Sequence, residues 1–136
     1  MVVATEQLEI LRGAGAFVFW PEGFMGRVGP ELAAFRALQP LASSVALEVQ
    51  ASFAQATPAG RIYLCCLLND ADATLGGAAW SDLSASTSQV IVSPGGCTPR
   101  ISTELGLFAH DALEHGVSAA LQRALTRYVA LYARRD

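Results

Sequence analysis

Apolar residues recur at helical spacing in two early segments of the chain. In residues 4–12, Leu8 and Leu11 lie three positions apart with a charged residue between them, which predicts a short opening helix. A second helix is expected after Gly29, because the proline that follows suits a first helical position and Glu31 complements the positive end of the helix dipole. The expected buried stripe of this second helix consists of Leu32, Phe35 and Leu38.

An aromatic run, "AFVFW", stands between these two helices. It is followed by Pro-Glu-Gly and then by a second short apolar run, which is the composition of a β-hairpin. The sequence therefore predicts a hairpin within residues 15–29. Phe17 and Phe19 would share one face of its first strand, and Val18 and Trp20 the other.

The middle of the chain alternates in a way that is typical of β-structure. Residues 45–53 alternate between apolar positions and polar or small ones, which predicts a half-buried strand. Residues 61–68, "RIYLCCLL", form an apolar run without polar alternation, as in a central strand that is covered on both faces. The "TPAG" sequence between them supplies turn residues, so we expect a hairpin over residues 45–68.

The last part of the chain is expected to be mainly helical. A short helix is predicted over residues 71–83, and a strand over residues 89–93 that a Pro-Gly-Gly sequence ends. The tail is interpreted as two helices joined at Gly116, because its apolar stripe changes phase there; Ser102 and Ser118 are their expected N-caps. The stripes are Leu105, Phe108, Ala109 and Ala112 before the junction and Leu121, Leu125, Tyr128 and Tyr132 after it.

These elements predict one globular domain over residues 1–136 with an α/β (α+β) fold. A chain of 136 residues is long enough to bury a core without disulfides or metals. We expect a mixed or antiparallel sheet of about four to five strands, which is the usual size, flanked by helices. The C-terminal part is expected to be helical.

Composition favours self-association and excludes several chemistries. Hydrophobic residues make up 52% of the chain and charged residues only 15%, so much apolar surface must be hidden, and we expect a homo-oligomer, most simply a dimer. The net charge of −3 offers no basic field to attract nucleic acid. All nine basic residues are arginine, which excludes a Schiff-base lysine and a P-loop lysine.

Cysteine usage and the hydropathy of the chain point to an intracellular protein. Cys65, Cys66 and Cys97 form no metal-binding spacing, and we interpret them as reduced, buried thiols. The sequence contains no run of eighteen apolar residues, which a membrane span would require. Its first residues also lack the pattern of a signal peptide. We expect a cytoplasmic protein without a cofactor, in a host cell if its origin is viral.

Both histidines fall in "LFAHDALEHG", residues 107–116, each with a carboxylate four positions away. His110 pairs with Glu114 and Asp111 with His115, but the two pairs lie on adjoining faces of a helix and do not converge. The spacing matches neither form of the zinc-protease motif. We therefore favour a solvated helix end over a metal or acid–base site.

A second candidate site follows the apolar run, in "LCCLLNDADATL". This segment resembles the first motif of haloacid-dehalogenase-like phosphatases. The resemblance implies that Asp70 is a nucleophile and Asp72 a general acid/base, working with Mg²⁺. Ala73 stands where that family usually has glycine, and no lysine is present for its later basic position. A small Mg-dependent phosphohydrolase is thus one alternative function, and an Asp-rich turn that caps the next element is the other interpretation.

A longer resemblance runs from the opening helix to Trp80. The order of the elements, with "GAFVFWPEGF" and "LLNDADATLGGAAW", resembles roadblock domains, the dynein-light-chain and gliding-regulator family. Ala71 and Thr74 replace the proline and the asparagine of that family's turn, and residues 89–136 lie outside the match. The resemblance implies a non-enzymatic α/β module that self-associates and holds protein partners.

A rival resemblance is viral. The sequences "GAGAF", "PEGF" and "FAQATPAGRIYL" are similar, in this order, to the third-reading-frame protein of adenoviral early region 4, which assembles into nuclear polymers. This resemblance implies a viral self-assembling regulator of host nuclear proteins.

Taken together, these observations favour a non-enzymatic, homo-oligomerising regulatory module that binds other proteins, with no catalytic residue and no metal ligand. The first hairpin is its expected interface, since an open aromatic edge is usually covered, most simply by the same edge of a second copy. Core packing of the residues that flank the hairpin turn is the alternative. The candidate interface residues are Phe17, Phe19, Trp20, Phe24 and Met25.

Overall fold

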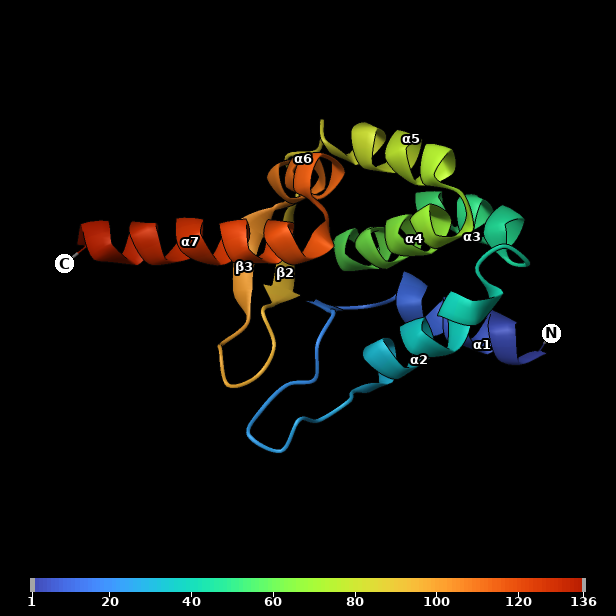
Figure 1. Cartoon of the computed structure of the whole chain (residues 1–136), viewed down its shortest axis with the longest axis horizontal. Helices are drawn as coiled ribbons and strands as arrows, with labels where there is room; N and C mark the ends of the chain where they lie inside the picture. Colours follow the sequence, from blue (N-terminus) through green and yellow to red (C-terminus); the bar gives the residue numbers. More distant parts are fainter. Residues whose placement is uncertain (1, 136) are drawn as a thin grey trace.

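The computed structural model describes the backbone of residues 2–135 and the side chains of residues 4–131. Within this part the chain is a mixed α/β protein with seven α-helices, a three-stranded sheet and a helical C-terminus (Figure 1). The elements are α1 (Val2–Arg12), β1 (Phe17–Val18), α2 (Pro30–Leu38), η1 (Gln39–Leu41), α3 (Ala46–Ser52), η2 (Phe53–Gln55), α4 (Pro58–Ala71), α5 (Ala73–Leu83), β2 (Gln89–Ser93), β3 (Ile101–Glu104), α6 (Leu105–His115) and α7 (Val117–Arg135). None of the described helices combines the length and the hydropathy that crossing a bilayer requires.

The sheet is smaller than the expected four to five strands. β1 pairs in parallel with β2, placing Phe17 beside Val92, and β2 pairs antiparallel with β3. The predicted hairpin of residues 15–29 is therefore wrong: β1 pairs with a distant strand, and the residues after it form a loop. Trp20 is followed by Pro21, whose nitrogen cannot donate to a strand ladder, which limits β1 to two residues.

The helix α4 lies where the sequence predicted a hairpin over residues 45–68, and this is the largest correction. Every residue from Ile62 to Leu68 is buried, as expected, but in a helix. The Thr57 hydroxyl accepts a hydrogen bond from the Gly60 backbone N–H at 3.0 Å, and Pro58 occupies the first helical position. A helix that is covered on all sides is apolar all round, so it shows no helical period.

The first half of that predicted hairpin is also helical. Val49 is fully buried, whereas Leu47 is 79% exposed. The buried residues Val45 and Val49 are four positions apart, which is helical spacing, and the apparent strand alternation arose from an exposed leucine.

Several predictions are confirmed. The opening helix, the helix that starts at Pro30 with Leu32, Phe35 and Leu38 buried, the helix within residues 71–83 and the strand over residues 89–93 all form. Gly116 separates α6 from α7 with a φ of 92°, which favours glycine. Ser102 and Ser118 are not N-caps, because Ser102 lies within β3 and Ser118 within α7. Of the expected stripe after Gly116, Leu121 is buried, Leu125 and Tyr128 are half-buried, and the side chain of Tyr132 is outside the described residues.

One tyrosine closes the outer edge of β1. The Tyr63 hydroxyl, which α4 presents, accepts a hydrogen bond from the Val18 backbone N–H at 2.7 Å and donates one to the Val18 carbonyl oxygen at 2.9 Å. The Phe17 ring packs against the Tyr63 and Phe108 rings at centroid distances of 4.8 and 5.8 Å. Burial raises the pKa of Tyr63, so the hydroxyl keeps its proton for this contact. At Val18, the free edge of β1 therefore has no unpaired backbone group to which a second strand could bond.

Candidate functional site

The five predicted interface residues separate into two groups. Phe17 is fully buried and belongs to the core, and Phe19 is half-buried against the Phe35 and Trp20 rings. Trp20, Phe24 and Met25 are 46%, 92% and 87% exposed, so the alternative that these three pack into the core is wrong. An edge-to-edge contact through Phe17 is not available in this fold.

Phe24 and Met25 form the tip of the loop between β1 and α2, residues 19–29, which we name the tip loop. Glu22 and Arg27 hydrogen-bond to each other through their backbones, with N···O distances of 2.9 and 2.6 Å. This pairing closes a narrow turn below the two apolar side chains. The Phe24 and Met25 side chains therefore project from the body at the end of a short turn whose base is hydrogen-bonded.

The tip loop is also fastened to the loop between β2 and β3. Glu22 accepts two hydrogen bonds from the Arg100 guanidinium, at 2.9 and 2.7 Å, and this pairing lowers the pKa of Glu22. The Gly23 N–H donates to the Gly96 carbonyl oxygen at 2.7 Å. A Cβ at Gly95 would lie 2.6 Å from the Trp20 Cβ, so only glycine permits this contact. These contacts fix the loop in the free protomer.

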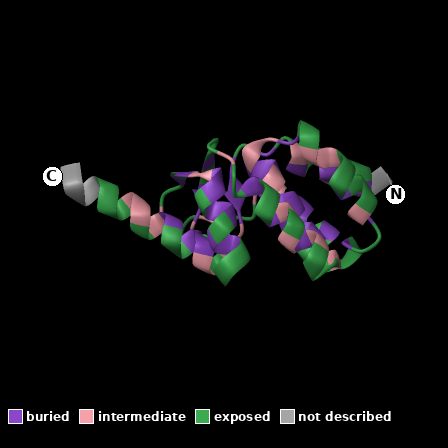
Figure 2. Cartoon of the chain, turned by 90° about the horizontal axis from the view of Figure 1, so that it is seen from above, coloured by how far each residue is buried: buried purple, intermediate pink, exposed green. Residues whose placement is uncertain are grey.

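A second exposed apolar region lies on α7. Ala120, Leu121 and Ala124 bury the first half of this helix against α6 and β3. α7 then continues beyond the other elements (Figure 1), and in Figure 2 the purple of buried residues gives way to pink and green along it. The same helical face continues there as Tyr128, half-buried, and Leu131, 58% exposed. The apolar stripe of α7 is therefore longer than the core that it covers.

Asp111 fixes α7 to the body. This side chain is buried, and its Oδ2 accepts a hydrogen bond from the Arg127 Nη1 at 2.8 Å, while the Arg127 Nη2 reaches the Thr103 hydroxyl at 3.4 Å. Arg123 lies 3.9 Å from the other carboxylate oxygen. The arginine pair thus joins α7 to α6 and β3.

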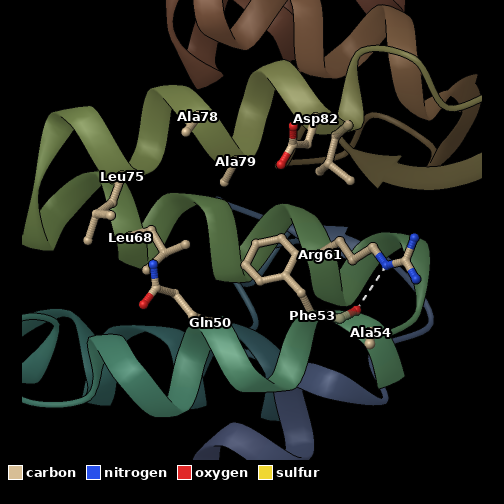
Figure 3. A pocket seen from close by; sticks show the side chains of 10 residues that line it. Gln50, Phe53, Ala54, Arg61, Leu68, Leu75, Ala78, Ala79 and Asp82 are labelled. Carbon is tan, nitrogen blue, oxygen red and sulfur yellow. Dashed lines mark hydrogen bonds between the residues drawn. The ribbon is translucent and has the colours of Figure 1, made fainter.

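The third region is a groove that the sequence did not predict. It lies between α3 and α5 with α4 as its floor, and encloses about 530 Å³ (Figure 3). Its lining is mainly apolar, with Arg61 and Asp82 toward one end in Figure 3; the Arg61 Nε donates to the Phe53 carbonyl oxygen at 3.1 Å. The lining residues are Gln50, Phe53, Ala54, Arg61, Leu68, Leu75, Ala78, Ala79, Asp82 and Leu83. Four of them, Gln50, Phe53, Arg61 and Leu68, come from segments that the sequence analysis assigned to strands.

The candidate phosphatase carboxylates lie at a helix end and not at a strand end. Asp72 joins α4 to α5, and its Oδ1 accepts hydrogen bonds from the Thr74 and Leu75 backbone N–H groups at 2.8 and 3.4 Å. Asp70 accepts one from the Gln39 side chain at 3.3 Å. The interpretation of this segment as a turn that caps the next element is confirmed, and the phosphohydrolase hypothesis loses the strand end on which it depended.

The histidine segment is solvated, as expected, except at one position. His110, Glu114 and His115 are exposed, whereas Asp111 is buried in its ion pair with Arg127. Asp111 follows Phe108 by three positions on the buried face of α6, a signal that could have identified it. Within the part of the chain whose side chains are described, no three histidine, cysteine, aspartate or glutamate side chains are grouped to hold a metal.

The three cysteines also include both buried and exposed side chains. Cys65 and Cys66 are buried, and burial raises the pKa of both. Cys97 is exposed in the loop after β2, so the prediction that all three thiols are buried is wrong for this one. The buried pair is chemically protected, since a protonated thiol is a poor nucleophile.

Comparison with protein-family models, with curated proteins and with solved structures finds no match to this chain.

Proposed function

We propose that this chain is a non-enzymatic, homo-oligomerising interaction module with a regulatory role, and that it assembles through α7. The observation that carries the proposal is the apolar stripe of α7, which extends past Ala124 to Leu131, 58% exposed among the described side chains. Exposed apolar faces of this kind usually mark interaction sites. We place the module in the cytoplasm, where an exposed thiol such as Cys97 stays reduced.

Charge favours a second copy of this chain as the occupant. Residues 117–135 contain four arginines and no acidic residue, whereas residues 1–116 contain eleven acidic residues and five arginines. α7 is therefore a cationic helix on an anionic body. Opposite potentials on two surfaces of one chain favour contact between copies.

The tip loop is the surface that we assign to a different protein partner. Phe24 is almost fully exposed on a loop that its contacts with Gly96 and Arg100 hold in one conformation. An aromatic anchor on a prearranged loop suits a pocket on a partner, since little conformational entropy is lost on binding. The roadblock-like and viral resemblances imply the same kind of role, and both remain predictions.

The oligomeric state tests this proposal. Sedimentation velocity over a range of concentrations should show the wild-type chain at twice its 14.3 kDa mass or more. Leu131→Asp should shift it to the monomer, because a charged side chain cannot replace an apolar contact. Ala130→Asp is the matched control, with the same charge on the neighbouring residue, which lies off the stripe. A wild-type chain that is monomeric throughout would overturn the proposal.

A further inference from the structure

The groove between α3 and α5 has the character of a binding site for an apolar helix. Its apolar lining includes Phe53, Leu68, Leu75 and Ala79, which are buried or half-buried, and Ala78 stands exposed at its border (Figure 3). Short side chains such as Ala78 and Ala79 let another backbone approach α5 closely. An amphipathic helix commonly binds in a groove of this kind through apolar residues on one face.

The charges beside the groove are the opposite of those on α7. Residues 46–83, which build the groove, contain four acidic residues and one arginine; Asp82 and Arg61 line the groove itself, and Asp82 is exposed. α7 contains four arginines and no acidic residue; Arg123 and Arg127 pair with Asp111 of their own protomer, and Arg134 and Arg135 follow later in the helix. A cationic helix with an apolar stripe therefore complements both the apolar floor and the acidic surroundings of the groove.

Length and position match as well. Residues 125–135 of α7 extend for about 16 Å at 1.5 Å per residue, and the eleven residues of α5 are equally long. In Figure 1 the free end of α7 and the groove lie toward opposite ends of the molecule. α7 cannot fold back into its own groove, so the two surfaces can meet only between copies.

We infer that the second half of α7 of one copy binds in the α3–α5 groove of a second copy. The inference rests on the proposed self-association and specifies its two surfaces. The two surfaces differ, so two arrangements are possible. In a closed dimer, each copy places its α7 in the groove of the other; in an open chain, one groove of the pair stays free and binds α7 of a third copy. Leu131 is the residue of α7 that we expect on the groove floor.

Blocking the groove tests the inference separately from the proposed function. Ala78→Arg places a long cationic side chain at the groove border, where it excludes the helix and repels it. The dissociation constant should rise about tenfold or more, as expected for the loss of one or two buried apolar contacts. Ser81→Arg is the matched control, since Ser81 is exposed on the same helix but does not line the groove.

Mixing two defective chains gives a sharper result. Leu131→Asp damages the helix and leaves the groove intact, and Ala78→Arg does the reverse. At a concentration at which the wild-type chain associates but each variant alone is monomeric, an equimolar mixture should form a one-to-one complex. In that complex one junction joins two unaltered surfaces, and the other brings the introduced carboxylate toward the introduced guanidinium. Pairing of one α7 with another could not produce this recovery.

Three outcomes are decisive once circular dichroism shows that both variants are folded. Monomeric variants whose mixture recovers association support the inference. If Ala78→Arg associates as tightly as wild type while Leu131→Asp does not, the groove is not the receiving surface, although self-association through α7 stands. If the wild-type chain does not associate, both the inference and the proposed function are wrong.

Discussion

β1 and the second half of α7 both carry apolar side chains, but the fold buries those of β1 and leaves part of the α7 face exposed. The aromatic run around β1 is the more hydrophobic of the two in sequence, yet Phe17 is fully buried and the Tyr63 hydroxyl satisfies both backbone groups of Val18. The second half of α7 contains arginines and a threonine, yet Leu131 on its apolar face is 58% exposed. The available surface is on the less hydrophobic segment.

The difference lies in how each segment meets its own core. A strand edge is unavailable once its N–H and C=O groups have partners, however apolar its side chains are. A helix satisfies its own backbone, so it can extend past the core while its apolar face remains uncovered. Hydrophobicity along the chain therefore does not identify the apolar surface that the fold leaves exposed.

The largest expected effect comes from placing the same charge in each region. Phe17→Asp should lower the free energy of unfolding by more than about 4 kcal/mol, because it opens a cavity and buries an unpaired carboxylate. At concentrations at which the wild-type chain is monomeric, Leu131→Asp should change it by no more than about 0.5 kcal/mol, as exposed substitutions do. Chemical denaturation of both variants provides the measurement. A folded, monomeric Phe17→Asp chain would instead restore β1 as the interface.

Tyr63→Phe should produce an intermediate effect and tests what seals β1. The aromatic ring is retained, so the change reports on the hydroxyl alone. Loss of about 1–3 kcal/mol is expected, because the Val18 N–H and C=O become buried without partners. Urea denaturation measures this loss, and faster hydrogen exchange at the Val18 amide should accompany it. Unchanged stability would mean that other contacts close the edge.

A smaller effect is expected where α7 leaves the body. Arg127→Gln should cost about 1–2 kcal/mol, because it leaves the buried Asp111 carboxylate without its nearest cation, whereas Arg123→Gln should cost no more than about 0.5 kcal/mol. Arg123 is the matched control, at 3.9 Å from Asp111 and with a side chain that is 52% exposed. Thermal unfolding distinguishes the two. Equal effects would show that the 2.8 Å contact of Arg127 is not what holds α7.

The sequence predicted the helices that begin or end at a recognisable residue. Pro30 marked the start of α2, and Gly116 marked the break between α6 and α7. The strand over residues 89–93 was identified as a short run that a Pro-Gly-Gly sequence ends. In each case a local signal and the apolar pattern agreed.

Residues 45–68 were mispredicted because the two kinds of signal disagreed. Thr57 followed by Pro58 is the same type of helix start as the one recognised at Pro30, but the continuous apolar run after it outweighed that signal. Burial was predicted correctly, and only the backbone conformation was wrong. A short apolar run does not distinguish a buried strand from a buried helix.

The wrong backbone conformation predicted for residues 45–68 also explains why the groove was not predicted. The groove needs α3 and α4 as helices, so an interpretation that placed strands there could not predict it. The exposure of Phe24 and Met25 was within reach, since a polar turn holds both residues. The burial of Phe17 required knowledge of Tyr63, forty-six positions away, which no local pattern contains.

Asp72 has a kinetic consequence for any helix that enters the groove. This one extended residue joins α4 to α5 and caps α5, and a Cβ at Gly76 would lie only 2.5 Å from the Asn69 Cα, so the two helices meet at a tight corner without a linker. The groove is therefore open before an occupant arrives, and no rearrangement precedes binding. Association should follow rigid-body docking, with rate constants on the order of 10⁵–10⁷ M⁻¹ s⁻¹. Differences in affinity between variants would then appear mainly as differences in how long the complex persists.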